Sequence, residues 1–259
     1  MIEILGVPGL QRPNATPNDA LQSPARQVER RASIPNQLLE AVPRKDYRRL
    51  LGRLEPVELF FGEILYEPGD EINYVYFPGT SLVSLLTLVD VRLALEVGVV
   101  GREGMVGIPL ALGYGISPFQ ALVQGGGMAL RMKAAQFLKE LRKSPALQRA
   151  LYRYTHTLMA EVAQTAACNR FHVVEERLAR WLLMTRDRVQ STEFRLTQEF
   201  LSHMLGVRRV GVTKAAGHLQ EHKLIEYSRG SIKIVDHAGL EAASCSCYLA
   251  TRKAPSSKG

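Results

Sequence analysis

The stretch from Leu196 to Asp236 constrains the fold of this chain most, because it places two short helices and a hairpin in a fixed order. Thr197 suits the N-cap of a first helix, and Gly206 follows where a tight turn must relax the backbone. A second helix is predicted from about Arg208 to Glu221. Two short apolar runs around the turn Ser228-Arg229-Gly230-Ser231 then predict a β-hairpin. This order is typical of a winged helix-turn-helix.

The outward face of the second helix carries side chains suited to reading DNA. In helix-turn-helix proteins the N-terminal half of this helix enters the major groove. There Arg can contact guanine through two hydrogen bonds, Lys can contact guanine or phosphate, and Val or Thr can touch a thymine methyl group. The predicted contact residues for double-stranded DNA are Thr197, Arg208, Arg209, Val210, Thr213 and Lys214, with Arg229 and Lys233 in the hairpin. Basic residues alone would be better explained as a solvated helix face, but the order of the elements favours DNA.

Composition agrees with a polyanionic partner. The 259 residues carry 33 Lys and Arg against 25 Asp and Glu, a net charge of +8. No run approaches the roughly 20 apolar residues that a membrane-spanning helix needs, and the first residues lack the features of a signal peptide. We therefore expect a cytoplasmic protein without a membrane partner. Three cysteines, an odd and sparse count, argue against a disulfide scaffold.

The N-terminal half has the sequence pattern of an antiparallel β-domain. Short β-rich runs alternate with turn sequences such as Glu67-Pro68-Gly69-Asp70, which predicts a β-barrel of the jelly-roll type. Before them, residues 37–54 predict one or two short helices. The expected strands are Leu59–Tyr66, Asn73–Phe77, Leu82–Val89, Leu93–Val100, Phe119–Gln124 and Met128–Met132.

A long helix is predicted after the β-domain. Ser144 can cap it, Pro145 suits its first turn, and it should run about 25 residues to about Arg170. Apolar residues recur at steps of four and three, which favours a coiled-coil-like dimer seam. The predicted seam residues are Leu147, Leu151, Tyr154, Leu158 and Val162. Packing of the same residues against the chain's own barrel is the alternative.

The next helix, Glu175–Arg188, is amphipathic, and Arg177, Arg180 and Arg186 are expected to project away from its apolar face. The whole is therefore an α+β chain with five parts. These are a flexible tail (1–35), a β-barrel sensor domain (36–143), a long dimerisation helix (144–170), a winged helix-turn-helix domain (171–250) and a second flexible tail (251–259).

At this point the chain resembles the Crp/Fnr family of transcription regulators. Three phrases carry the resemblance: Phe61 to Asp70 in the barrel, Glu175 to Leu182 after the long helix, and Leu196-Thr197-Gln198-Glu199 leading to Arg208-Arg209. The resemblance implies a homodimer on a palindromic DNA site, a small-molecule effector, and RNA polymerase as a partner if the protein is an activator. Of the family's base-reading positions, Arg209 and Lys214 match, whereas Val210 stands where the catabolite-activator branch has Glu. We expect a different operator, with an apolar preference at that base step.

The family's cyclic-nucleotide cassette is altered in this sequence. Gly104 matches its glycine, but Met105 stands at its glutamate, and Phe119-Gln120 replace its Arg-Ser pair. Because an anionic phosphate needs charge-assisted donors, cyclic AMP in the usual pose is not expected. These four residues are the candidate effector pocket. A tight structural turn at residues 101–107, and a ligand-independent regulator whose barrel is only a scaffold, are the alternatives.

Metal and enzyme chemistry are not expected. The first histidine is His156 and the first cysteine Cys168, so the barrel can supply neither a His-based metal site, nor a haem ligand, nor the cysteine cluster of the family's iron–sulfur members. Cys245-x-Cys247 underfills a tetrahedral site, although nearby His237 leaves a metal or redox role open. Cys168 is expected to be a small buried hydrophobe. Without phosphate-loop, metalloprotease or nucleophile-elbow motifs, we predict no enzyme and no cofactor.

Overall fold

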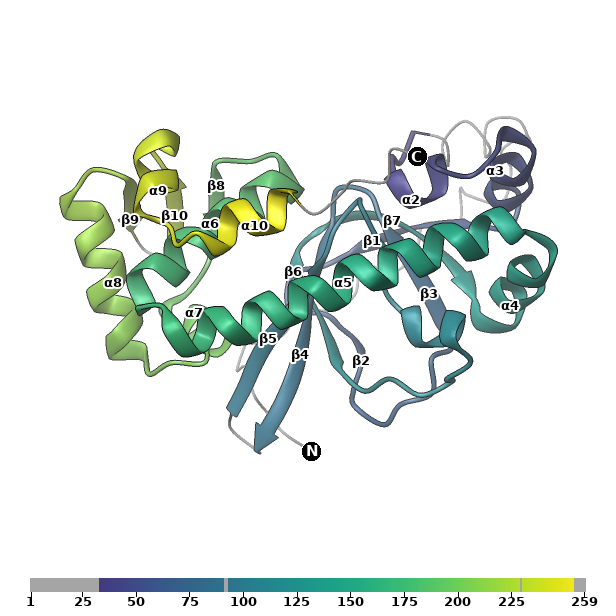
Figure 1. The fold of residues 1–259 in the computed structure, drawn as a ribbon, viewed down its shortest axis with the longest axis horizontal. Helices are drawn as coiled ribbons and strands as arrows, with labels where there is room; N and C mark the ends of the chain where they lie inside the picture. Colours follow the sequence, from purple (N-terminus) through teal and green to yellow (C-terminus); the bar gives the residue numbers. More distant parts are fainter. Residues whose placement is uncertain (1–32, 91–92, 229, 254–259) are drawn as a thin grey trace, which may run out of the picture.

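The computed structural model describes residues 33–90, 93–228 and 230–253 of the chain. Two antiparallel sheets form the N-terminal part, a long helix runs across them, and a helical part with a small sheet follows at the other end of that helix (Figure 1). Most of the tail expected at residues 1–35 lies outside the described residues. Ile34 does not belong to a flexible tail, because its side chain is buried in the core.

Two short helices precede the strands, as predicted: α2 (Gln37–Glu40) and α3 (Arg44–Leu51). Asn36 caps α2 through its side-chain oxygen, which accepts from Leu39 N at 3.1 Å. Its amide nitrogen donates to the carbonyl oxygens of Pro78 at 2.9 Å and Gly104 at 3.0 Å. One buried side chain thus joins α2 to two loops of the β-domain.

The β-domain consists of two antiparallel sheets, as a jelly roll does, so the predicted antiparallel β class is confirmed, although the described strands do not close into one barrel. One sheet has the order β1-β7-β3 and the other β2-β6-β4-β5. The expected strand Leu59–Tyr66 is divided in two, because Gly62 takes a positive φ of 82° in a turn. The strands are β1 (Glu55–Leu59), β2 (Ile64–Tyr66), β3 (Tyr74–Pro78), β4 (Leu82–Asp90), β5 (Leu93–Val100), β6 (Gln120–Gly125) and β7 (Gly127–Lys133).

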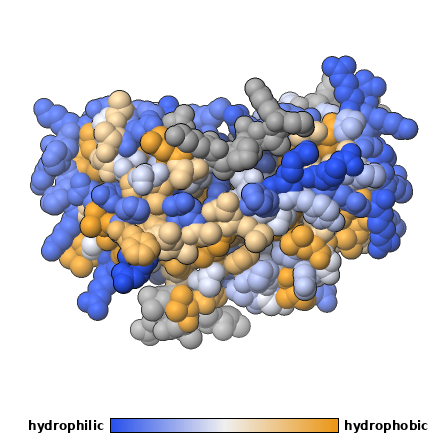
Figure 2. Space-filling view, viewed as in Figure 1, coloured by the Kyte–Doolittle hydropathy of each residue, from blue (hydrophilic) through white to orange (hydrophobic). Residues whose placement is uncertain are grey.

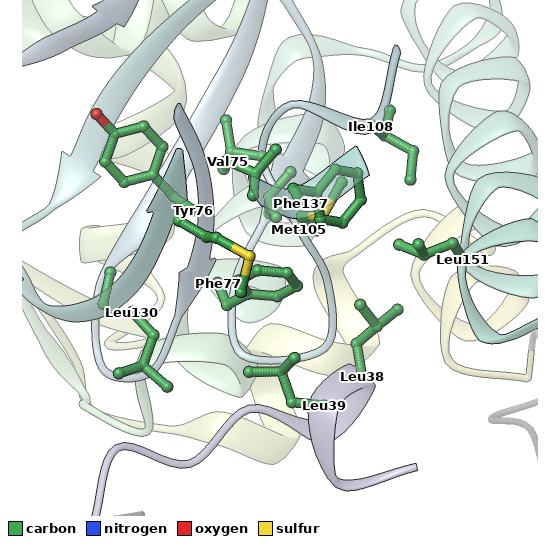
Figure 3. Close-up of a cluster of buried hydrophobic side chains, with 14 of the residues drawn as sticks. Leu38, Leu39, Val75, Tyr76, Phe77, Met105, Ile108, Leu130, Phe137 and Leu151 are labelled. Atoms are coloured by element: carbon green, nitrogen blue, oxygen red, sulfur yellow. The ribbon is translucent and has the colours of Figure 1, made fainter. Parts of the chain in front are cut away.

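Helices α4 (Ala134–Lys143) and α5 (Pro145–Phe171) cover the core that the two sheets share. Phe137 of α4 and Leu151 of α5 are fully buried, and Figure 3 shows them beside Phe77 and Met105. A 3-10 turn, Ile108–Leu112, adds Ile108 to the same cluster. Burial of such large apolar side chains is the main stabilising contribution to this part of the molecule.

Helix α5 begins as the sequence predicts, because Ser144 Oγ accepts from Leu147 N at 3.1 Å and Pro145 takes the first position. The role of its predicted seam is corrected. The structure buries Leu147, Leu151, Tyr154 and Leu158 in the core of the chain's own sheets, and Val162 is half-buried. These side chains hold α5 to its own β-domain, so they are not free to form a dimer seam.

The C-terminal part begins with α6 (Val174–Val189) and contains a three-stranded sheet of order β8-β10-β9. Contrary to expectation, Arg177 and Arg180 of α6 are buried. Residues 251–253 are helical and do not belong to a tail. No helix in the described ranges is long and apolar enough to cross a membrane. The remaining elements are β8 (Glu193–Arg195), α7 (Gln198–Leu205), α8 (Arg209–Glu221), β9 (Ile225–Ser228), β10 (Ser231–Ile234), α9 (His237–Ala243) and α10 (Cys247–Lys253).

Candidate nucleic-acid interface

Helices α7 and α8 and the turn between them form as the sequence predicts. Thr197 Oγ1 accepts from Phe200 N at 3.1 Å and caps α7. Gly206 ends α7 with φ 61°, the left-handed conformation that glycine adopts without strain. A Cβ at Gly206 would lie 2.7 Å from Leu95 Cδ1 of β5, so the end of this leucine side chain would have to shift to admit one.

The predicted reading face of α8 is exposed. Arg209, Val210, Thr213 and Lys214 are all exposed, and Val210 keeps 59% of its surface in solvent. The opposite face is buried in the core of the C-terminal part. Its members are Val212, Ala215, Ala216 and Leu219. Arg208 precedes the helix as its N-cap residue and is also exposed. This arrangement leaves the basic face of α8 available to a ligand.

Gln198, which the sequence analysis did not single out, organises this face. Its Oε1 accepts from Thr213 Oγ1 at 2.9 Å and from Arg209 Nε at 3.3 Å. This contact involves Nε of Arg209, so the two terminal nitrogens of the guanidinium group can bind a partner. Gln198, in the first turn of α7, therefore positions two side chains of α8. The spacing of residues within one helix does not indicate such a contact between two helices.

The hairpin β9–β10 lies beside α8. Gln220 Oε1 accepts from Tyr227 N at 2.9 Å, which ties β9 to the end of α8. Lys233 is exposed on β10, where Glu226 of β9 and Glu193 of β8 pair with it across the sheet. Two neighbouring carboxylates weaken the attraction of Lys233 for phosphate. Arg229, the other predicted hairpin contact, lies outside the described residues.

The candidate effector pocket is filled on the Gly104 and Met105 side. A Cβ at Gly104 would run into the ring of Tyr154, and Met105 is 1% exposed in the core shown in Figure 3. Phe119 is half-buried against the same core, and Gln120 Nε2 donates to Glu67 Oε2 at 2.8 Å. The four predicted residues thus serve packing and hydrogen bonds within the chain, and none supplies a positive charge for a phosphate.

The loop that carries Gly104 is joined to α6 by a charged cluster. Arg188 of α6 donates from Nε to Glu103 Oε1 at 3.0 Å and from one terminal nitrogen to both oxygens of Glu161 at 3.0 and 3.1 Å. Only 11% of the Arg188 side chain and 12% of the Glu161 side chain are exposed. Burial raises the pKa of Glu161, and the charge of Arg188 opposes this rise. The cluster links the turn at 101–107, α5 and α6.

A second polar cluster lies between the sheets and α6. Trp181 Nε1 donates to Glu96 Oε1 at 2.8 Å, and Ser84 Oγ lies 2.6 Å from Glu96 Oε2 and 2.7 Å from Gln124 Oε1. A single hydroxyl proton cannot serve both oxygens, so Ser84 donates to Glu96 when this carboxylate is ionised, and to Gln124 when Glu96 is protonated and donates to Ser84. Burial raises the pKa of Glu96 to about 7, although the hydrogen bonds from Ser84 and Trp181 oppose the rise.

The face of α5 that points away from the sheets carries a second stripe, in which apolar and small residues are joined by His156 and Arg170. Its members recur at steps of four and three, the spacing of a coiled-coil seam. Tyr152 and Met159 expose 55% and 67% of their surface. The stripe runs through Tyr152, His156, Met159, Ala163, Ala166 and Arg170. Figure 2 shows an apolar band on this side of the molecule, where α5 runs in Figure 1.

The three cysteines and one histidine gather where α5 ends. Cys168 lies in the last turn of α5, and His172 follows as its C-cap residue. Cys245 lies between α9 and α10, and Cys247 is the first residue of α10. The ligand atoms of all four lie within 4.8 Å of one another. His237, the histidine that the sequence analysis considered, instead lies 4.0 Å from Glu241. The signal that was missed is the nearness of Cys168 to His172, four residues apart at the end of the long helix.

Comparison with known proteins places the motif in context. Residues 176–243 match the family model of the Crp-like helix-turn-helix domain. No curated protein sequence matches the chain. The structure is similar to that of FixK2 from Bradyrhizobium japonicum, at 15% identity and a TM-score of 0.63, with 74% of this chain and 98% of that chain covered.

Two further solved structures are similar to the same extent. The c-di-GMP responsive global regulator CLP of Xanthomonas campestris has 15% identity and a TM-score of 0.62, with 75% of this chain and 100% of that chain covered. A CRP/FNR family transcriptional regulator of Thermus thermophilus, TTHA1359, has 21% identity and a TM-score of 0.60, with 73% and 98% covered. At these identities the likeness shows a common fold.

Proposed function

We propose that the chain is a regulator of the Crp/Fnr type that reads a specific DNA sequence through α8, because residues 176–243 match the Crp-like helix-turn-helix domain and the fold is that of solved regulators of this family. The observation that carries the proposal is the exposed face of α8, on which Arg209, Val210, Thr213 and Lys214 lie together while the opposite face is buried. In this fold the N-terminal half of such a helix enters the major groove.

Each side chain of this face suits a particular contact. Arg209, held at Nε by Gln198, offers its terminal nitrogens to guanine O6 and N7. Val210 presents an apolar surface to a thymine methyl group, and Lys214 offers a charge to guanine or phosphate. Arg208, Thr197 and, more weakly, Lys233 lie around this face as phosphate contacts. We expect base choice to depend on Arg209 and Val210.

The active form that we propose is a homodimer through the exposed stripe of α5. Alanines at two positions of the stripe let two helices approach closely, and Tyr152 and Met159 supply apolar area. Two copies related by a two-fold axis would present two α8 helices to half-sites about one helical turn apart. Light scattering of the Met159→Glu variant tests this. We expect a monomer, because two negative charges would face each other, whereas a persistent dimer would refute the stripe as the interface.

The variant Arg209→Ala tests base reading. We expect affinity for the selected site to fall by about 1–3 kcal/mol, and base choice to relax at one position, while binding to random DNA changes little. Arg142→Ala removes another exposed arginine, from the end of α4, and is the matched control. Selection from random DNA gives the site, and titration at fixed salt gives both affinities. Equal losses on selected and random DNA would refute base reading by Arg209.

For the β-domain we propose that cyclic nucleotides are not bound in the family's usual pose. Tyr154 occupies the space beside Gly104, and Met105 belongs to the core. This packing also favours the second candidate, a ligand-independent regulator whose β-domain is a scaffold. Thermal shift of the purified protein against cyclic nucleotides and a metabolite set distinguishes them, because a ligand of the native state raises Tm. A rise with cyclic AMP would refute the proposal, and a rise with another metabolite would refute the scaffold.

A further inference from the structure

We propose that Cys168, His172, Cys245 and Cys247 together bind one tetrahedral divalent metal ion of the zinc class. Three thiolates and one imidazole form a complete ligand set for a structural zinc site. Zinc is favoured over hard ions such as Mg²⁺ and Ca²⁺ because those prefer oxygen ligands. The proposal revises the expectation, from sequence alone, that the chain has no metal site.

The distances fit such an ion better than they fit a disulfide. Sulfurs at about 2.3 Å from a tetrahedral ion lie about 3.8 Å apart. Cys168 Sγ and Cys245 Sγ are 3.5 Å apart, and Cys247 Sγ is 3.5 Å from His172 Nδ1. A disulfide would need about 2.05 Å between two sulfurs and would leave the third thiol and the imidazole without a role.

The surroundings of the four ligands are those of a closed site. All three thiols are buried and form a small cluster of their own, and His172 is half-buried. Gln164 Nε2 donates to Cys247 Sγ at 2.9 Å, the kind of contact that orients a ligating sulfur. Four protein ligands without an open position are typical of a structural metal and not of a catalytic one.

The negative charge that this metal site would carry has positively charged side chains close to it. Three thiolates and a neutral imidazole around a divalent ion carry a net charge of −1. Arg177 and Arg180 are buried close enough to Cys168 to act on it electrostatically. Their hydrogen-bond partners, the Leu205 carbonyl and Thr165 Oγ1, are uncharged, and the Nε of each has no partner among the described residues. The carboxylates of Glu96 and Glu161 also act on Arg180, whereas only Cys168 and Cys245 supply negative charge beside Arg177. A buried cation is costly without an opposite charge, and the metal–thiolate centre would supply it for Arg177.

The ion would fasten the end of the chain to the long helix. Cys168 and His172 lie at the end of α5, and Cys247 begins α10. Tyr248, the next residue, is buried and donates to Asp187 Oδ2 of α6 at 2.8 Å. Metal binding would therefore hold α5, α6 and α10 together behind the DNA-binding helices.

The first experiment measures metal content in the full-length protein, purified anaerobically with a thiol reductant from zinc-supplemented cells. We expect one zinc per chain, and no iron or acid-labile sulfide. Replacement of zinc by Co²⁺ should produce the visible absorption of tetrahedral cobalt with thiolate ligands. Protein that is folded, reduced and free of zinc, and that gives no such absorption with Co²⁺, would overturn the proposal. An iron–sulfur cluster on these cysteines would overturn it as well.

The second experiment compares variants at His172, which avoids disturbing the three buried thiols. His172→Gln should weaken zinc binding, in competition with a chromogenic chelator, by more than the roughly 10–100-fold that loss of an outer-shell partner costs. His172→Cys, which restores four ligands, should retain zinc and shift the cobalt spectrum. His222→Gln changes an exposed histidine at the end of α8 and should behave as wild type. Equal zinc affinity in His172→Gln and wild type would overturn the assignment of this ligand set.

Discussion

Replacing Arg188 by Met should destabilise the protein strongly, because it leaves Glu103 and Glu161 without their shared cation. Methionine keeps much of the apolar stem, so the change mainly removes the charge. Breaking a buried ion pair costs about 3–5 kcal/mol. Because the Glu103 side chain is 30% exposed and keeps part of its hydration, we expect about 3 kcal/mol, the lower end of that range. At about 2–4 °C per kcal/mol for chains of roughly 150–250 residues, this corresponds to a fall in Tm of roughly 6–12 °C.

The assay is thermal unfolding at one protein concentration, at pH 8 and again at pH 5, since a dimer would make Tm concentration-dependent. Burial raises the pKa of Glu161 in the folded state, and the variant lacks the cation that opposes this rise. The difference from wild type should therefore be largest at pH 8 and shrink as pH falls and the carboxylate takes up a proton. Arg186→Met is the control, because Arg186 pairs with Asp187 in a half-exposed position where such a pair contributes about 0–1 kcal/mol.

The double variant Arg188→Met/Glu161→Gln completes the test. It removes the more buried of the two unpaired carboxylates, so it should be more stable than Arg188→Met alone. A loss of less than about 1 kcal/mol in the single variant would refute the reasoning, because typical surface substitutions cost no more than this. A double variant less stable than the single one would refute the charge argument in particular.

Three further predictions concern other contacts of the same region. In wild type the folded state favours the protonated form of Glu96, so its free energy of unfolding should fall by about 3 kcal/mol as pH rises from 4.5 to about 7. Glu96→Gln lacks this titration and should become more stable relative to wild type over the same range. A Tm difference that is constant with pH would contradict this. Gly206→Ala should cost about 1–2 kcal/mol in urea unfolding through its positive φ, whereas Gly217→Ala, in open space within α8, should stabilise by up to about 1 kcal/mol. Gln198→Ala should reduce affinity for the selected DNA site more than for random DNA, since it releases Arg209 and Thr213; titration of both DNAs tests this, and equal affinities to wild type would count against it.

Local signals in the sequence predicted local structure well. The caps Ser144 and Thr197, the left-handed Gly206 and the two-helix motif all form as expected. These features depend on residues within one or two turns of each other, so their physical cause is present in the sequence itself. The exposed face of α8 was predictable for the same reason, since helical spacing separates it from the buried face.

What the sequence could not decide is which partner covers each face of a helix. Helix α5 carries two stripes with steps of four and three, one beginning at Leu147 and one at Tyr152, and only the packing of the sheets selects the first as core. The burial of Arg180 and the gathering of Cys168 with Cys245 depend on contacts between segments that are distant in the chain or on helices that cross. The spacing of residues along the chain does not indicate such contacts.

The contact between Leu95 and Gly206 has a mechanical consequence. Leu95 belongs to β5, and its methyl group lies against the turn that joins α7 to α8, so the hairpin β4–β5 supports the helix-turn-helix from behind. Neither helix can swing toward the sheets without displacing this hairpin. Bending of β4 and β5 would consequently press on this turn and change the tilt of α8 relative to the β-domain.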